Sequence, residues 1–279
     1  MPIKIVTDST CDLPEQAVAD LGITVVPLYI NVGQESYLDK IDMSRHEFYE
    51  RLPHFEHHPQ TASPGPEMFR ETYERLAAEG ADEILSIHIS VSLSGTLNTA
   101  QLGADATDIV PVTVFDSGQL SIGTGFLVEA AAKAGAAGHS VAEILETIKE
   151  MGKRTYVSAA LDTLEFLQRS GRMNWAVSKI GGLLKIKPLL TMHDGEAGVQ
   201  QVRTERRATQ RILDLLTDLA PLEKLALVHT NAPEKMRELR EKVGHLFPEG
   251  QDPIEVDVTP VIGAHIGPGA AGFACVSAR

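Results

Sequence analysis

The sequence has few cysteines and no long apolar run. Cys11 and Cys275 stand near opposite ends of the 279 residues and form no C-x-x-C pair. We therefore expect no disulfide framework and no cysteine-based zinc site, and a reducing, cytoplasmic location fits. No segment approaches the roughly 18 apolar residues of a spanning helix, so we expect no stable membrane insertion. The start of the sequence lacks the charged leader and apolar stretch of a signal peptide.

The charge balance is acidic, with a formal net charge of −13. An acidic surface repels nucleic acid and anionic membranes, so neither is expected as a partner. The charge does not exclude a small anion bound in a local pocket. The hydrophobic fraction of 43% and charged fraction of 23% are those of an ordinary globular protein.

Strand-like and helix-like segments alternate in the first half. Strands are predicted at 3–6, 23–31, 83–89 and 110–115. Helices are predicted at 13–21, 44–52, 67–78, 121–133 and 141–151, a further helix is predicted to start near Ser94, and a loop is predicted at 53–66. Such alternation predicts a largely parallel sheet covered by helices. Loops at the carboxyl ends of its strands, including 90–96, are where open α/β sheets bind ligands.

The second half predicts a mixed sheet. Strands are expected at 156–160, 183–192, 198–203, 225–229, 254–258 and 273–277, and helices at 162–168, 205–219 and 233–243. Asp194-Gly195 between two of these strands indicates an antiparallel hairpin. We therefore predict two closely apposed α/β domains, an N-terminal one of residues 1–154 and a C-terminal one of residues 155–279.

The serine-rich turn at 90–96 is the first candidate site. Gly95 would let the chain turn tightly, and Ser94 can present its hydroxyl and its N–H group. The free N–H groups and dipole of a helix starting there would suit a carboxylate or phosphate. The alternative is a plain helix cap, in which Ser94 satisfies only its own helix.

Two further segments could contribute donors. Thr61 precedes a predicted helix and could donate its hydroxyl to an anion, or could simply face water. His265 stands beside Gly267-Pro268-Gly269, which permits a tight bend and a close approach of the backbone to a ligand. The alternative for His265 is a structural role.

Catalytic and metal motifs are weak. Neither a G-x-S-x-G elbow nor a phosphate-binding G-x-x-x-x-G-K-[ST] loop is present. Asp8 and Asp116 could form an acid–base pair, although aspartates at strand ends commonly cap turns. His54, His57 and His58 lie in a proline-rich segment, and we expect no metal there. We therefore assign no catalytic residue and no cofactor. A hydrolase or transferase using Ser94, Asp8 or Asp116 on a small anion is the alternative.

Arg203, Arg206 and Arg207 form a basic cluster in an acidic protein. Arg206 and Arg207 fall in the first turn of a predicted helix, where the dipole disfavours positive charge. The cluster is either a solvated helix start or a docking patch for an acidic partner.

Seven short motifs follow one another along nearly the whole chain. They are Thr7-Asp8-Ser9, Thr61-Ala62-Ser63-Pro64, Leu93-Ser94-Gly95-Thr96, Asp116-Ser117, a segment from Leu164 to Gly171-Arg172, a segment from Gly181 to Leu190, and Gly267-Pro268-Gly269-Ala270. In this order they resemble the DegV family of bacterial fatty-acid-binding proteins. Some motifs depart from the usual family pattern, such as Ser170-Gly171-Arg172-Met173 in place of Gly-Gly-Arg-Ile.

The resemblance implies a two-domain α/β carrier with one long-chain, palmitate-like fatty acid buried in it. It implies that Thr61 and Ser94 hold the carboxylate, with His265 nearby. In some family members the fatty acid is handed to a separate kinase, and Arg203 matches the docking position for that kinase. The resemblance therefore implies a lipid-binding protein that serves phospholipid metabolism, with catalysis in its partner.

Overall fold

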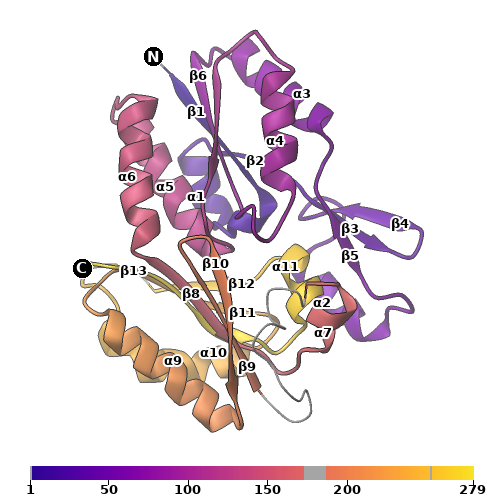
Figure 1. Cartoon of the computed structure of the whole chain (residues 1–279), viewed down its shortest axis with the longest axis vertical. Coiled ribbons are helices and arrows are strands. Elements are labelled where there is room, and N and C mark those ends of the chain that lie inside the picture. The colour runs from indigo at the N-terminus through magenta and orange to yellow at the C-terminus, as the bar shows by residue number, and fades with distance from the viewer. Residues whose placement is uncertain (1, 173–186, 252) are drawn as a thin grey trace.

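The computed structural model describes residues 2–172, 187–251 and 253–279. Its strands form one parallel, one mixed and one small antiparallel sheet (Figure 1). The α/β fold class predicted from the sequence is confirmed. The parallel sheet lies within residues 1–154 and the mixed sheet within residues 155–279, while the exact domain boundary stays a prediction.

The parallel sheet has the strand order β2-β1-β6-β7, and each neighbouring pair is parallel. Its strands are β1 (Ile3–Asp8), β2 (Thr24–Val26), β6 (Glu83–His88) and β7 (Val112–Asp116). The helices of this half are α1 (Glu15–Asp20), α2 (Arg45–Arg51), α3 (Pro66–Ala78), α4 (Thr96–Asp105), α5 (Ile122–Ala136) and α6 (Val141–Lys153). Phe69 and Tyr73 of α3 pack on one face of the sheet, and Phe126 and Leu127 of α5 pack on the other.

The mixed sheet has the order β10-β9-β8-β13-β11-β12, and only β11 and β12 run parallel. Its strands are β8 (Thr155–Ala160), β9 (Lys187–His193), β10 (Glu196–Val202), β11 (Leu222–His229), β12 (Ile254–Asp257) and β13 (Ala271–Ser277). Its helices are α7 (Glu165–Arg169), α9 (Glu205–Leu219), α10 (Pro233–Val243) and α11 (Pro260–Ile266). The predicted hairpin is β9–β10, whose turn residues Asp194 and Gly195 both have positive φ. Residues 183–186 of its predicted first strand lie outside the described residues.

A small antiparallel sheet, β4-β3-β5, corrects two predictions. The predicted strand 23–31 is two strands in different sheets, β2 and β3 (Tyr29–Val32). Pro27 separates them, because proline has no N–H group to continue a ladder. The predicted loop 53–66 contains β5 (Gln60–Ala62), which pairs with β3, and β4 (Glu35–Leu38) pairs on the other side.

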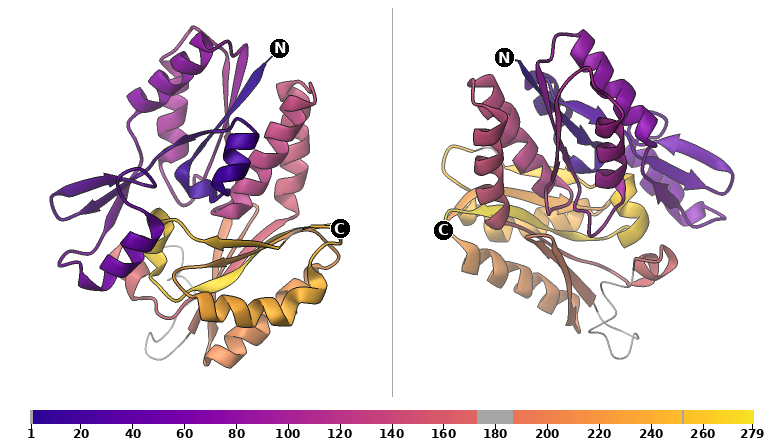
Figure 2. Two further views of the ribbon diagram at one scale, coloured as in Figure 1. Left: turned by 180° about the vertical axis from the view of Figure 1, so that it is seen from behind. Right: turned by 45° about the horizontal axis from the view of Figure 1, so that its top comes forward.

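The core joins the two larger sheets. Adjacent residues of β11 point to opposite faces, as a strand requires. Leu225 and Leu227 pack under α9 and α10, whereas Ala226 and Val228 belong to the cluster that also contains Leu85 and Phe126 of the first half. Figure 2 shows α5 and α6 beside the mixed sheet in both views. The two halves therefore share one continuous apolar core.

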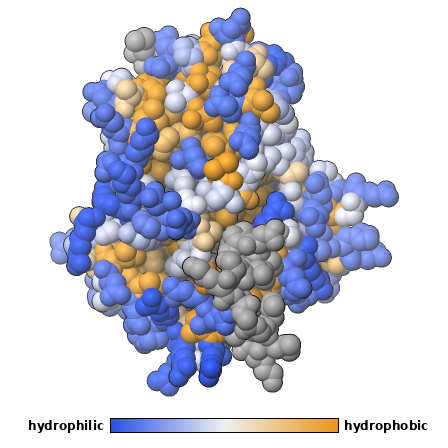
Figure 3. All heavy atoms as spheres, in the orientation of Figure 1, coloured by the Kyte–Doolittle hydropathy of each residue, from blue (hydrophilic) through white to orange (hydrophobic). Residues whose placement is uncertain are grey.

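The surface carries most of the charge. In Figure 3, hydrophilic side chains cover much of the protruding β3–β4 hairpin. On the upper half of the molecule, hydrophilic and apolar side chains are mixed. The exposed large apolar residues come from separate segments and include Val91, Leu102 and Ile109. Within the described residues, no helix is both long enough and apolar enough to span a membrane.

Candidate functional site

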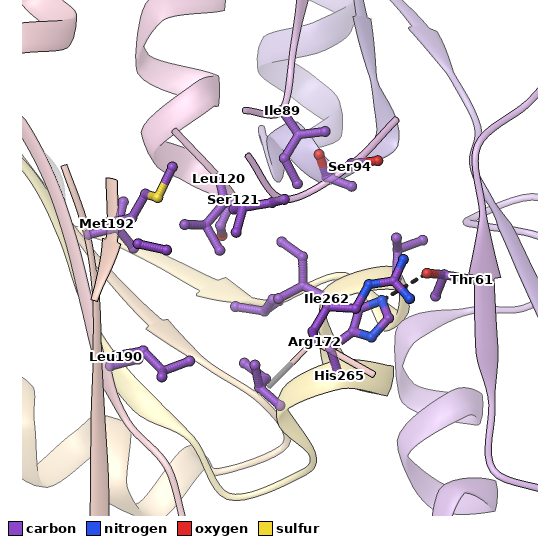
Figure 4. Close-up of a pocket in the computed structure, with 18 of the residues that line it drawn as sticks. Thr61, Ile89, Ser94, Leu120, Ser121, Arg172, Leu190, Met192, Ile262 and His265 are labelled. Atoms are coloured by element: carbon purple, nitrogen blue, oxygen red, sulfur yellow. Dashed lines mark hydrogen bonds between the residues drawn. The ribbon is translucent and has the colours of Figure 1, made fainter. Parts of the chain in front are cut away.

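A cavity lies between the two halves of the molecule, and both contribute to its wall. The cavity volume is about 160 Å³. On the same measure, one buried water molecule needs roughly 10 to 15 Å³. Most of the wall is apolar, including Leu190 and Met192 of β9 and Ile262 of α11 (Figure 4). The cavity can therefore accept an apolar group many atoms long.

Thr61 and His265 meet at one end of this cavity. Thr61 Oγ1 lies 2.8 Å from His265 Nε2, which joins β5 to the last turn of α11 (Figure 4). The sequence did not predict α11, although Thr259 and Pro260 are a common helix start. The Nδ1 atom of His265 is buried and has no hydrogen-bond partner among the described residues. Burial, and secondarily the neighbouring Arg172 and His58, lower the pKa of His265 to about 3, so the imidazole is neutral at pH 7.

Ser94 belongs to a row of three hydrogen-bonded hydroxyls. Ser63 Oγ lies 2.9 Å from Thr96 Oγ1, which lies 2.8 Å from Ser94 Oγ. We call Ser63, Thr96 and Ser94 the hydroxyl row. The helix predicted to start near Ser94 begins instead at Thr96, whose N–H group donates to Ser94 Oγ at 3.3 Å. Ser94 therefore satisfies a helix N–H group and also lines the cavity.

Gly95 is the N-cap of α4 and lines the cavity. The prediction that glycine is needed there for a tight turn is wrong. Its φ of −77° and ψ of 0° are open to other residues, so the turn does not require glycine. A Cβ atom there would meet no atom within 4 Å. The Gly-Pro-Gly bend is different, because Gly267 and Gly269 have positive φ and a Cβ on Gly267 would collide with the ring of Phe166.

Arg172 is a cavity residue whose role the sequence did not predict. Its guanidinium lies beside His265 and Thr61 in Figure 4, and its Nη1 donates to the carbonyl of Ser170 at 3.1 Å. The side chain is half-buried and supplies positive charge at the polar end. In the sequence, Arg172 stood out only as part of the motif Ser170-Gly171-Arg172-Met173. Met173 lies outside the described residues. Residues 181–186 of the motif that ends at Leu190 also lie outside them.

Neither Asp8 nor Asp116 lies in the described wall of the cavity. Asp8 is 0% exposed, and its carboxylate accepts hydrogen bonds from Thr10, from the N–H group of Ile89 at 3.1 Å and from His88 Nδ1 at 2.9 Å. Asp116 accepts from the N–H groups of Val91 and Gly118, at 3.3 and 2.9 Å. Both carboxylates thus fix the turns that follow parallel strands.

A buried serine–histidine–aspartate chain also stands apart from the cavity. Ser86 Oγ lies 2.7 Å from His88 Nε2, and His88 Nδ1 lies 2.9 Å from Asp8. All three residues are 0% exposed. Tyr73 OH contacts the Ser86 hydroxyl at 2.9 Å on its other side. These hydrogen bonds support the strand ends that precede residues 90–96. Because Ser86 is fully buried, its hydroxyl cannot reach a substrate.

The described residues contain no group of three or more His, Cys, Asp or Glu side chains placed to hold a metal ion. Two of the histidines at 54, 57 and 58 have neighbours that the structure defines. His57 lies against Gly33, and the rings of His58 and Phe166 lie 5.6 Å apart. The two free cysteines are buried in different hydrophobic clusters.

The basic cluster lies at the start of α9, away from the cavity wall. Arg203, Arg206 and Arg207 are all exposed, and Thr204 caps the helix by accepting from the N–H group of Arg207 at 3.3 Å. Arg206 borders a groove between α9 and α10 that also contains Lys235 and Lys242. Among the described residues, none of the three arginines forms an ion pair, while Glu205 pairs with Lys235.

The fold and site define a class of α/β protein in which two sheets enclose an apolar cavity with a hydroxyl- and imidazole-lined end. The model of the DegV family, described as uncharacterised proteins, matches residues 2–278, and the chain belongs to this family. A DegV domain-containing protein of Halalkalibacterium halodurans is 35% identical over an alignment of 278 residues that covers 97% of this chain and 97% of its own.

Solved structures agree with this assignment. A fatty-acid-binding DegV family protein of Thermus thermophilus is 33% identical and superposes with a TM-score of 0.90, covering 99% of this chain and 100% of its own. The fatty-acid-binding protein DegV of Bacillus subtilis is 30% identical, with a TM-score of 0.90 and 99% of each chain covered.

Proposed function

We propose that the protein binds one long-chain fatty acid without reacting it. In this proposal the acyl tail fills the apolar cavity, and Thr61, Ser94 and His265 hold the carboxylate beside the backbone of Gly95. The observation that carries it is the junction of an apolar cavity with the Thr61–His265 pair and Ser94 at one end. The fatty acids bound by the Thermus and Bacillus relatives support the same ligand class.

The magnitudes are consistent with binding through the tail. A sixteen-carbon acid would bury about fourteen methylenes, worth on the order of 11 kcal/mol before the costs of ordering and association. The carboxylate must leave water, which costs several kcal/mol unless donors replace the water. Hydroxyls, the N–H groups at the start of α4 and the charge of Arg172 can offset that cost. The tail then supplies affinity, and the polar end fixes orientation.

Hydrogen-bond directions at the polar end follow from this placement. If Thr61 donates its only proton to the carboxylate, Nε2–H of His265 must donate to Thr61 Oγ1. The second ring nitrogen, Nδ1, then carries a lone pair in the neutral imidazole. A carboxylate has no proton to give to this lone pair, so in this arrangement His265 acts on the head group through Thr61.

The proposed destination of the fatty acid is a separate fatty acid kinase, which would phosphorylate the carboxylate. The exposed cluster of Arg203, Arg206 and Arg207 is the proposed docking surface, because its charge would attract an acidic partner. A hydrolase or transferase is less well supported. Asp8 and Asp116 are occupied in turns, and the hydrogen-bond partners of the Ser94 hydroxyl among the described residues are groups of Thr96.

Lipid extraction tests the proposal directly. Protein purified under native conditions should release intact fatty acid in about one-to-one ratio, measured by mass spectrometry against a protein standard. Delipidated protein should then bind palmitate in calorimetry. Protein that carries no lipid and, after delipidation, binds phosphorylated metabolites but not palmitate or oleate would overturn the proposal.

A further inference from the structure

Thr96 lies behind the two hydroxyls of the row that reach the cavity. It is the first residue of α4 and is 0% exposed. Ser63 and Ser94 line the cavity, whereas Thr96 is not part of its described wall. Ser63 comes from the segment after β5 and Ser94 from the turn after β6, so Thr96 connects two separate parts of the polar end.

The number of protons limits how the row can be arranged. Each hydroxyl has one proton to donate, and the two hydrogen bonds of the row use two of the three. Thr96 can donate to only one neighbour. If it donates to Ser94, the Ser94 proton is left for the cavity; if it donates to Ser63, the Ser63 proton is left.

The backbone hydrogen bond at Ser94 is compatible with the first arrangement. The N–H group of Thr96 already donates to Ser94 Oγ at 3.3 Å. When the Thr96 hydroxyl donates there as well, both lone pairs of Ser94 Oγ are filled, and its proton points away from the helix. Successive donation in one direction also polarises a hydroxyl chain and strengthens its last donor.

We propose that Thr96 orients the Ser94 hydroxyl as a donor toward the cavity and so favours a carboxylate head group over a neutral one. This inference rests on the proposed function. Thr96 acts as a positioning residue, since it reaches the ligand only through Ser94. A carboxylate accepts hydrogen bonds only, and such a bond is about twice as strong as one between neutral groups. An alcohol can donate or accept, so it depends less on the direction of the row.

The test compares palmitate with hexadecanol, which has the same sixteen-carbon tail. Dissociation constants are measured on delipidated full-length protein, and the readout is the ratio of the two. The Thr96→Val change removes the hydroxyl at nearly constant volume, and we expect palmitate to bind about fivefold more weakly. Hexadecanol should change by less than about twofold. Thr96→Ser restores the hydroxyl and should restore the ratio.

Thr124→Val is the matched control. Thr124 of α5 is also 0% exposed, and its hydroxyl lies 3.0 Å from Ser117 Oγ, outside the row. This variant should leave the palmitate-to-hexadecanol ratio unchanged.

Each outcome decides the inference. An unchanged ratio in Thr96→Val or an equal fall in the Thr124→Val control overturns it. If Thr96→Val does not fold, Thr96→Cys replaces it, since a thiol is a weak donor. Failure of the unaltered protein to bind palmitate overturns the proposed function as well, whereas normal binding with an unchanged ratio in the variant overturns this inference alone.

Discussion

The neutral, buried imidazole of His265 predicts a specific loss of stability in acid. Burial, with secondary effects from Arg172 and His58, lowers the pKa of His265 to about 3, against about 6.5 in an unfolded chain. Below pH 6.5 the unfolded chain therefore binds a proton that the folded protein does not. Since the state that binds more protons is favoured as pH falls, this histidine makes the fold less stable between pH 6.5 and pH 3.

The size of the effect follows from the two pKa values. At pH 5.5 an unfolded histidine of pKa 6.5 is about nine-tenths protonated, while His265 stays neutral in the fold. Relative to pH 8, the difference lowers the free energy of unfolding by about 1.4 kcal/mol. Other groups titrate too, so the quantity to compare is the pH-dependent change in the protein and in its His265→Gln variant.

The assay is urea unfolding of delipidated protein at pH 8, 7, 6 and 5.5. The unaltered protein should lose about 1.4 kcal/mol more than His265→Gln over this range. His46→Gln is the control, because the His46 side chain is 81% exposed. Parallel curves for the protein and His265→Gln would refute the reasoning, because they would mean that His265 takes up its proton without unfolding.

Three further predictions concern the head group, the docking surface and the core. The Thr61→Ala, Ser94→Ala double variant should bind palmitate at least tenfold more weakly in calorimetry, because two hydroxyl donors to the carboxylate are lost. Arg203→Ala should slow phosphorylation by a partner kinase in a coupled assay, with an unchanged dissociation constant for palmitate. Arg45→Met should lower the free energy of unfolding by about 3 kcal/mol in urea, because the buried Asp12 carboxylate loses a partner at 2.7 Å.

Controls and contrary results separate these effects from damage to the fold. Unchanged palmitate affinity in the double variant, with native circular dichroism, would remove the head-group assignment. Arg237→Ala is the control for the docking surface, since Arg237 is exposed and pairs with Glu234 on α10. Weaker palmitate binding in Arg203→Ala would place Arg203 at the lipid rather than at a partner. A loss below about 1 kcal/mol in Arg45→Met would mean that Asp12 is satisfied by Ser121 and Thr259 alone.

Local patterns were enough to predict most of the larger elements. The stripe of Ala208, Ile212 and Leu216 predicts α9, and Asp194-Gly195 predicts the β9–β10 hairpin, because each depends on neighbours in sequence. The small sheet was missed for the opposite reason. Its strand β5 has only three residues and is defined by pairing with β3, some thirty positions earlier. Short strands of this kind carry little periodicity of their own.

The candidate site was predictable in its parts and not in its geometry. The turn containing Ser94, the threonine Thr61 and the Gly-Pro-Gly bend near His265 were each visible as local motifs. The contact between Thr61 and His265 spans 204 positions, and that between Ser63 and Thr96 spans 33. No local pattern records such contacts. Their candidate status rested on the family resemblance, and the physical connections appear only in the fold.

The two groups of polar side chains in the candidate site differ in how far they are satisfied without a ligand. The hydroxyl row pairs all but one of its protons, since Ser63, Thr96 and Ser94 bond to one another and to a helix N–H group. The imidazole of His265 has its Nδ1 buried without a partner in the described structure, which costs about 1 to 3 kcal/mol. A carboxylate has no proton to give to a lone pair on that atom. In the proposed function, the free proton of the row and the proton of Thr61 are therefore donated to the head group, while His265 acts through its hydrogen bond with Thr61.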